Sequence, residues 1–223
     1  MCYSIESSAK NTLFSLIAII VLFTSNVSHF KWIAMIILGW CSMQFAEMLL
    51  WFTNPRKSCT PMNKLITFTL IPLILLSQPL LAVFGSFFVN PWSKCSQNRR
   101  LFIVMFSIFI TLSFLLHFYG NITKYCTTVT SQGHLDWWIS KYPGSSPIAY
   151  TLWLIILCIP IFVLWDISYK VVVAICILPL LGFIYGLRTD SKGSIWCHYA
   201  SYTSIVGLLV YALYKFKIYN ILK

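Results

Sequence analysis

Charge is what this sequence has least of. Only 9% of its 223 residues are charged, and just five of them are acidic, whereas an ordinary soluble domain is about one quarter charged. No polar block is long enough to fold as a separate soluble domain, so residues 1–223 are predicted to form a single integral membrane domain. With a hydrophobic share of 59% and a mean hydropathy of +0.80, the composition predicts a multi-pass membrane protein.

Basic residues are more numerous than acidic ones, but they are scattered. Sixteen Lys and Arg give a net charge of +11, and they lie in the short polar joints between apolar runs rather than along one helix. That arrangement is typical of membrane flanks, where Lys and Arg contact anionic lipid headgroups. We therefore expect membrane lipids, and not nucleic acid, as partners.

Seven apolar runs are long enough to cross a bilayer, since a spanning helix needs about 20 mostly apolar residues. This predicts an all-α fold, a polytopic transmembrane helix bundle. The first run, LFSLIAIIVLF after Lys10, also resembles a signal peptide, but no small-x-small cleavage site follows it, so it is counted as a span. The predicted spans are residues 12–28, 30–52, 65–89, 101–120, 148–167, 170–187 and 195–214.

One joint, residues 121–147, is much longer than the others. It mixes polar residues with Trp137, Trp138 and Tyr142, and amphipathic rings of this kind collect where a membrane meets water. The segment is therefore predicted to be an interfacial loop between the fourth and fifth spans.

The basic residues do not decide the orientation, because the seven-span topology puts eight of the sixteen on each side of the membrane. Cys59 and Cys126 share the side of the N-terminus, where they could pair in an oxidising compartment. The sequon NIT at Asn121 lies on that side and NVS at Asn26 on the other, so at most one is glycosylated. We predict an N-terminus that is outside or lumenal and a cytosolic C-terminus.

Glu47, in the stretch MQFAEMLLW, is a carboxyl group within an apolar run. A charge at that depth is costly unless it is protonated or paired, so such residues usually point into a bundle or a wet cavity. Gln44 lies on the same helix face, and Trp40 and Trp51 lie one turn beyond the pair on either side. We predict that Glu47 and Gln44 line a polar interior.

A second polar group, Ser77 and Gln78, falls in the middle of the third predicted span, in LLSQPLL. Pro79 has no N–H to donate to the Leu75 carbonyl, so the helix can break there, and Pro72 adds a second break in the same span. Broken helices with polar side chains at mid-membrane are how many transporters build a substrate site. The predicted lining is completed by one face of the last span, with His198, Ser201 and Tyr202.

The N-terminal side of the membrane also collects histidines and acids that could hold a metal ion. The candidate ligands are His117, His134, His198 and Asp136, with Glu47 as a further carboxylate. Three imidazoles and a carboxylate around an open position favour zinc. The alternative is that the histidines are interfacial residues and that Glu47 only hydrogen-bonds to a neighbouring helix.

No segment carries a reaction signature, so the sequence favours a non-enzymatic role. The main hypothesis is a small channel, transporter or ligand-binding bundle for a small molecule or ion, with Glu47 as a protonatable gate or contact. One alternative is a metal-dependent intramembrane or lipid hydrolase that uses a metal-bound water. Another is a structural or assembly protein.

Three motifs, MQFAEMLLW, SQPL in the third predicted span and GSIWCHYAS at the start of the last, resemble uncharacterised multi-pass proteins of large double-stranded DNA viruses. The resemblance covers about three helices and implies a place in a virion or host-cell membrane, with no activity. Other seven-span families are not matched. The last span has no central lysine for retinal and no HxxxH for a ceramidase-type zinc site, and Gln78-Pro79 reverses the order found in PQ-loop carriers.

Overall fold

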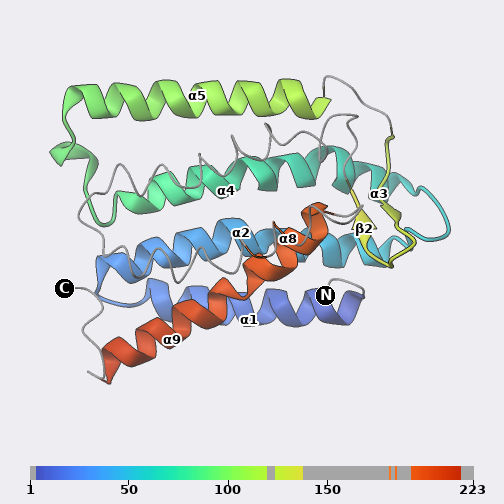
Figure 1. Cartoon of the computed structure of the whole chain (residues 1–223), viewed down its shortest axis with the longest axis horizontal. Helices are drawn as coiled ribbons and strands as arrows, with labels where there is room; N and C mark the ends of the chain where they lie inside the picture. Colours follow the sequence, from blue (N-terminus) through green and yellow to red (C-terminus); the bar gives the residue numbers. More distant parts are fainter. Residues whose placement is uncertain (1–3, 120–123, 138–180, 182–183, 185–191, 217–223) are drawn as a thin grey trace.

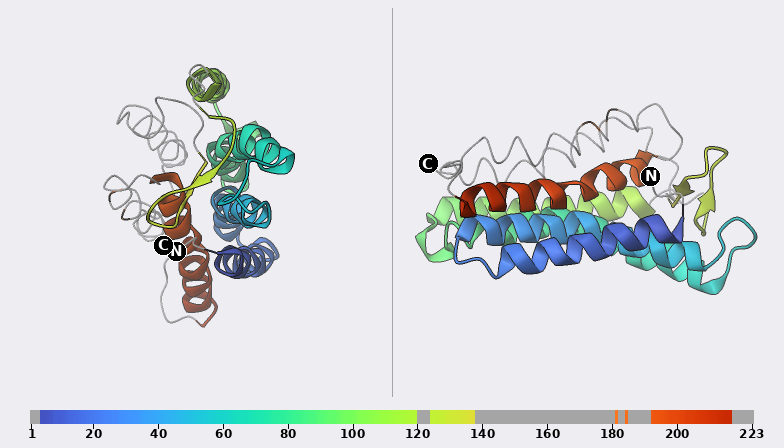
Figure 2. Two further views of the ribbon diagram at one scale, coloured as in Figure 1. Left: turned by 90° about the vertical axis from the view of Figure 1, so that its right-hand side faces the viewer. Right: turned by 90° about the horizontal axis from the view of Figure 1, so that it is seen from below.

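Long helices lie side by side along one axis, and a small β-hairpin covers one end of the bundle (Figure 1). The computed structural model describes residues 4–119, 124–137, 181, 184 and 192–216. Seen end on, α5, α4, α2 and α1 follow one another in a row, and α8 and α9 lie against one side of it (Figure 2). The fifth and sixth predicted spans fall almost entirely outside the described residues.

The first two helices are α1 (Ile5–Phe23) and α2 (Ser28–Phe52). The start of α1 is fixed by Ser4, whose hydroxyl oxygen accepts the backbone N–H of Ser7 at 3.2 Å, because a free N–H at a helix start needs an acceptor. The helix therefore begins seven residues before the predicted span, and Asn11 lies inside it. The two helices run antiparallel and make the most extensive contact in the described structure.

The third predicted span is built from three consecutive helical pieces. They are α3 (Pro61–Leu65), a π-helical turn η1 (Ile66–Leu70) and α4 (Ile71–Ser86). Pro72 has no N–H to donate to the Phe68 carbonyl four residues earlier. The hydroxyl of Tyr119 donates to this carbonyl at 2.7 Å, so a neighbouring helix supplies what the proline removes.

Tyr119 ends α5 (Gln97–Tyr119), which follows a short 3-10 turn, η2 (Trp92–Lys94). Four of the described helical stretches are long and apolar enough to cross a membrane. They are Ile5–Phe23, Ser28–Phe52, Pro61–Ser86 and Gln97–Leu116. The structure is thus mostly helical and compatible with a membrane protein, but the predicted total of seven spans is not supported.

The last predicted span, residues 195–214, is not one continuous helix. It is divided at Tyr202 into α8 (Lys192–Ser201) and α9 (Thr203–Lys215). The hydroxyls of Ser201 and Thr203 each donate, at 2.6 Å, to the carbonyl three residues earlier. Hydroxyl side chains that bond to nearby carbonyls compete with the regular helical ladder, and the helix breaks between them.

The described part of the predicted interfacial loop is a folded hairpin, which adds a small sheet to a fold predicted as all-α. Strands β1 (Thr128–Val129) and β2 (Leu135–Asp136) pair antiparallel, and Gly133 takes a φ of 81° in the turn. The side chain of Trp137 is only 2% exposed. It packs into the protein, whereas the sequence placed it against the membrane interface.

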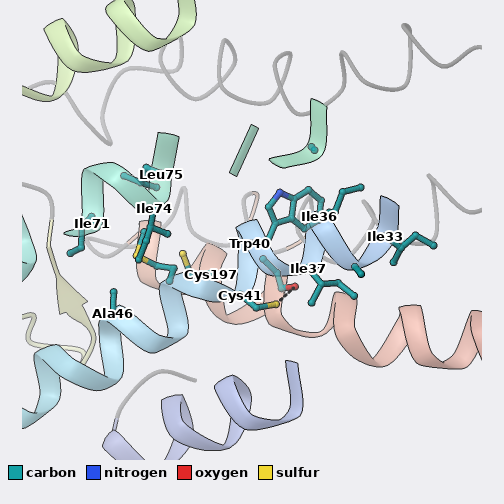
Figure 3. Close-up of a cluster of buried hydrophobic side chains, with 14 of the residues drawn as sticks. Ile33, Ile36, Ile37, Trp40, Cys41, Ala46, Ile71, Ile74, Leu75 and Cys197 are labelled. Atoms are coloured by element: carbon teal, nitrogen blue, oxygen red, sulfur yellow. Dashed lines mark hydrogen bonds between the residues drawn. The ribbon is translucent and has the colours of Figure 1, made fainter. Parts of the chain in front are cut away.

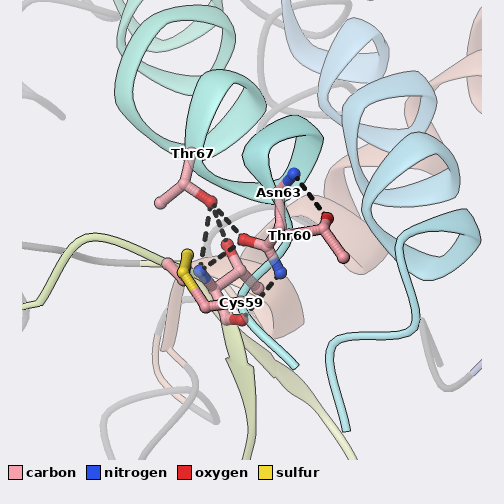
Figure 4. Close-up of a disulfide and its surroundings, with 6 residues drawn as sticks. Cys59, Thr60, Asn63 and Thr67 are labelled. Atoms are coloured by element: carbon pink, nitrogen blue, oxygen red, sulfur yellow. Dashed lines mark hydrogen bonds between the residues drawn. A yellow bond between two sulfur atoms is a disulfide. The ribbon is translucent and has the colours of Figure 1, made fainter. Parts of the chain in front are cut away.

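A disulfide and a buried polar cluster fasten this hairpin to the start of α3 (Figure 4). The predicted pairing of Cys59 with Cys126 is confirmed, and it joins positions 67 residues apart. The Asn63 side chain accepts the backbone N–H of Thr127 at 2.9 Å and donates to its carbonyl at 3.0 Å. The Thr67 hydroxyl lies 2.7 Å from that of Thr127, so each polar group buried here has a partner.

The helix interfaces combine large apolar side chains with close backbone contacts. Ile33, Ile37 and Trp40 of α2 pack in one buried cluster with side chains of α4 and α8 (Figure 3). Gly39 allows a close approach of two backbones, because a Cβ added there would lie 3.0 Å from the Cα of Gln78 on α4. A glycine at such a point lets two helices approach closely, as is common in membrane bundles.

Candidate functional site

Glu47 lies near the hairpin end of α2 and is fully buried. Its Oε1 accepts a hydrogen bond from the indole Nε1–H of Trp137 at 3.1 Å, across a sequence separation of 90 residues. A buried carboxyl group needs such a donor because burial removes the water that would otherwise hydrate it. Trp137, which directly follows β2, therefore contacts Glu47 from the hairpin end of the bundle.

Gln44, one turn before Glu47, belongs to a polar network that joins three helices. Asn11 of α1 donates from Nδ2 to the Gln44 Oε1 at 3.4 Å, and the same nitrogen lies 3.4 Å from the Nδ1 of His198 on α8. On the other side of that imidazole, Nε2 lies 3.1 Å from the hydroxyl oxygen of Tyr202. The contacts run in the order Gln44, Asn11, His198, Tyr202, and this set is called the polar network below.

The polar network fixes the proton position on His198. The amide Nδ2 of Asn11 can only donate, so the facing Nδ1 of the imidazole accepts. In the neutral ring the proton is then on Nε2, which donates to the Tyr202 oxygen. The oxygen of the half-buried Tyr202 is then the acceptor in this bond.

The polar residues at mid-membrane do not join this network. Gln78 is fully buried at the α2–α4 crossing, and its amide atoms have no hydrogen-bond partner among the residues that the structure describes. The neighbouring Ser77 donates to its own helix at the Ile74 carbonyl, 2.8 Å away. The described contacts thus leave the predicted lining in two parts, one around Gln78 and one around Gln44.

Two of the proposed zinc ligands, Asp136 and His134, belong to the hairpin. Asp136 forms an ion pair with Lys124, whose Nζ also donates to the Asp136 carbonyl at 3.0 Å. His134 is buried, and this burial lowers the pKa of its imidazole. The side chain of His117 lies outside the described residues. Within the described ranges, no three His, Cys, Asp or Glu side chains come together as a metal site.

The sequence reasoning missed Asn11, which connects Gln44 with His198. Asn11 was left out because the first span was predicted to begin at residue 12. A signal was present, since Ser8, Asn11 and Ser15 recur at spacings of three and four and so share one helix face. Ser8 and Ser15 are both buried, which makes this the inner face of α1.

Comparison of the chain with protein-family models, curated proteins and solved structures found no match. The class of protein therefore follows from the fold alone. The described residues form a helical bundle with four apolar helices of membrane-spanning length, a disulfide-linked hairpin at one end and a polar network beneath that hairpin. Any function has to be argued from this site.

Proposed function

We propose that the chain is a multi-pass membrane protein that binds or transports a small molecule or ion, with Glu47 as its protonatable contact. The observation that carries the proposal is a fully buried carboxyl group one turn from a network that joins α1, α2 and α8. An acid at membrane depth is expensive and is usually retained for a function.

A membrane setting is supported by the way α1 distributes its residues. Its buried residues are Ser8, Ser15, Ala18 and Leu22, whereas Leu13 and Ile20 point outward and are 62% and 61% exposed. A helix at the surface of a soluble protein would carry polar residues at such outward positions. Small and polar residues at helix contacts, with an apolar outer face, are what a lipid surrounding favours.

Two features of the surroundings have opposite effects on the protonation of the Glu47 carboxyl group. The indole N–H of Trp137 is a donor only, so its hydrogen bond favours the ionised carboxylate, whereas burial favours the neutral acid. A cation or a hydrogen-bond donor that binds beside the carboxyl group can therefore change which form, ionised or neutral, is favoured. Binding would then be coupled to the uptake or release of a proton.

The test is proton flux into liposomes that contain the full chain and an entrapped pH indicator, under an imposed membrane potential. We expect Glu47→Gln to reduce the flux at least about tenfold, which corresponds to a rise of about 1.4 kcal/mol in the free-energy barrier to proton transfer. Glu6→Gln is the matched control, because Glu6 is an exposed carboxyl at the same end that pairs with Lys10. Wild-type flux no greater than that of empty liposomes, or equal flux in both variants, would contradict the proposal.

A structural or assembly role is the second candidate, and the bond between Glu47 and Trp137 also supports it. In that case the carboxyl fastens the hairpin to α2 and nothing more. Glu47→Gln would then lower thermal stability and leave flux untouched, which separates the two roles in one set of variants.

The proposed location is a virion or host-cell membrane, and its support is the resemblance of three motifs to viral multi-pass proteins. The proposed orientation has the hairpin end outside or in a lumen. It is supported by the Cys59–Cys126 disulfide, because disulfides persist in oxidising compartments.

A further inference from the structure

The two ends of the bundle differ in how their charges are paired. In the part of the chain that the structure describes, the ion pairs are Lys10 with Glu6 and Lys124 with Asp136. Both lie at the hairpin end (Figure 1). Among the described residues, partners therefore neutralise two lysines at this end, where Arg56, Lys57 and Lys64 have no carboxylate partner.

At the opposite end, the turn between α4 and α5 carries basic residues with no such partner. Lys94, Arg99 and Arg100 fall within PWSKCSQNRR, residues 91–100, and none of them has a carboxylate partner among the described residues. Lys94 and Arg99 are exposed. This segment is called the basic turn below.

Contacts within the basic turn hold Arg100 in place and leave some of its guanidinium N–H groups without an acceptor among the described residues. Its Nη2 donates to the Ser93 carbonyl at 3.0 Å, and its guanidinium carbon lies 5.7 Å from the centre of the Trp92 ring. Its Nε is shielded from solvent and has no acceptor among the described residues. Trp92 itself packs edge-on against Phe87 at 5.1 Å, so the ring that supports the guanidinium is anchored to the end of the α4 segment.

We propose that the basic turn binds the headgroup of an anionic membrane lipid. A guanidinium with free donors suits the paired oxygens of a phosphate, and a tryptophan beside it is typical of the depth where headgroups lie. Lysines and arginines in such a position attract anionic lipids. The inference does not depend on Glu47, which lies at the other end of the bundle.

The outer surface of α5 favours a lipid over a free phosphate ion. Directly after Arg100, Leu101, Phe102 and Met105 are 52–61% exposed. These side chains form an apolar strip on the first turns of α5, next to the basic turn. A lipid can place its headgroup on the basic turn and its acyl chain along this strip. A phosphate ion would contact the basic turn only.

The test is native mass spectrometry of the full chain in detergent, titrated with phosphatidylglycerol or with phosphatidylcholine. The test variant combines Lys94→Gln, Arg99→Gln and Arg100→Gln, and the control combines Arg56→Gln, Lys57→Gln and Lys64→Gln at the hairpin end. A basic residue near anionic lipid is worth about fivefold in binding. We expect the test variant to weaken phosphatidylglycerol binding by about a hundredfold and the control to leave it within about twofold.

Three results would overturn the proposal. They are wild-type protein that binds both lipids equally, an equal loss in the two triple variants, and displacement of phosphatidylglycerol by millimolar inorganic phosphate.

Retention of the Cys59–Cys126 disulfide and of the melting temperature shows that each variant is folded. If the test variant does not fold, Arg100→Lys decides, because it keeps the charge but loses the planar fork. It should weaken phosphatidylglycerol binding and leave phosphatidylcholine binding unchanged, and an unchanged phosphatidylglycerol affinity counts against the site.

Discussion

Glu47 shows how a single residue depends on a distant part of the chain. From the sequence it is an acid on a helix face with Gln44, and spacing alone places the two together. The donor that it contacts, Trp137, comes from a hairpin 90 residues away. Nothing in the spacing around either residue indicates this bond, because it depends on how the hairpin packs against the bundle end.

The bond between Glu47 and Trp137 can be measured with a double-mutant cycle. Trp137→Phe removes the donor and leaves a buried acceptor, so we expect a loss of about 1–3 kcal/mol in the free energy of unfolding. In the Glu47→Gln background the loss should be smaller, because a hydrogen bond to a charged group is the stronger one. Denaturant unfolding of the four proteins gives the coupling energy, and Trp92→Phe, at a half-exposed ring, is the control. Purely additive losses would show that the bond is no stronger to the carboxyl group of Glu47 than to an amide oxygen.

At the scale of elements, the prolines and hydroxyl residues decide where helices break. The sequence pointed to breaks at both Pro72 and Pro79 in the third span, but Pro79 lies inside the continuous helix α4. The irregular turn η1 ends just before Pro72. The last predicted span breaks at Tyr202, where neighbouring hydroxyls bond to backbone carbonyls. Apolar run length indicated that helices exist, but not where their ladders are interrupted.

Tyr119→Phe tests whether α5 repairs the ladder that Pro72 interrupts. Loss of the hydroxyl removes the donor to the Phe68 carbonyl, and we expect the free energy of unfolding to fall by about 1–2 kcal/mol. Tyr125→Phe is the matched control, because its ring is 57% exposed and its loss should be within about 0.5 kcal/mol. Thermal unfolding followed by circular dichroism compares the two. Equal melting temperatures would mean that the contact between α5 and the π-helical turn does not stabilise the fold.

At the scale of the whole molecule, the disulfide and the charges give the bundle two different ends. The hairpin end has Cys59–Cys126 and both of the described ion pairs. The basic turn at the other end has no carboxylate partner among the described residues. Disulfides persist in oxidising compartments, and this is the basis of the orientation proposed for the hairpin end.

The disulfide provides a test of stability and orientation together. Cys59→Ser with Cys126→Ser should lower the free energy of unfolding by about 2–4 kcal/mol, because the link constrains the unfolded chain. In cells, thiol labelling with and without a reductant reports whether the pair is oxidised and on which side it lies. A membrane-impermeant label that reaches Cys59 in intact cells only after reduction is the expected result. Labelling in intact cells without any reductant would contradict an oxidised pair.

The sequence by itself determined the helical, apolar character of this protein, the place of Glu47 within an apolar helix and the grouping of Cys59 with Cys126. These follow from composition and run length, which are local properties of the chain. The tertiary structure decided that Asn11 connects Gln44 to His198, that Trp137 contacts Glu47, and that no described carboxylate pairs with the basic turn. Such contacts depend on which helix faces meet, and in a chain this apolar many different faces could pack equally well by composition alone.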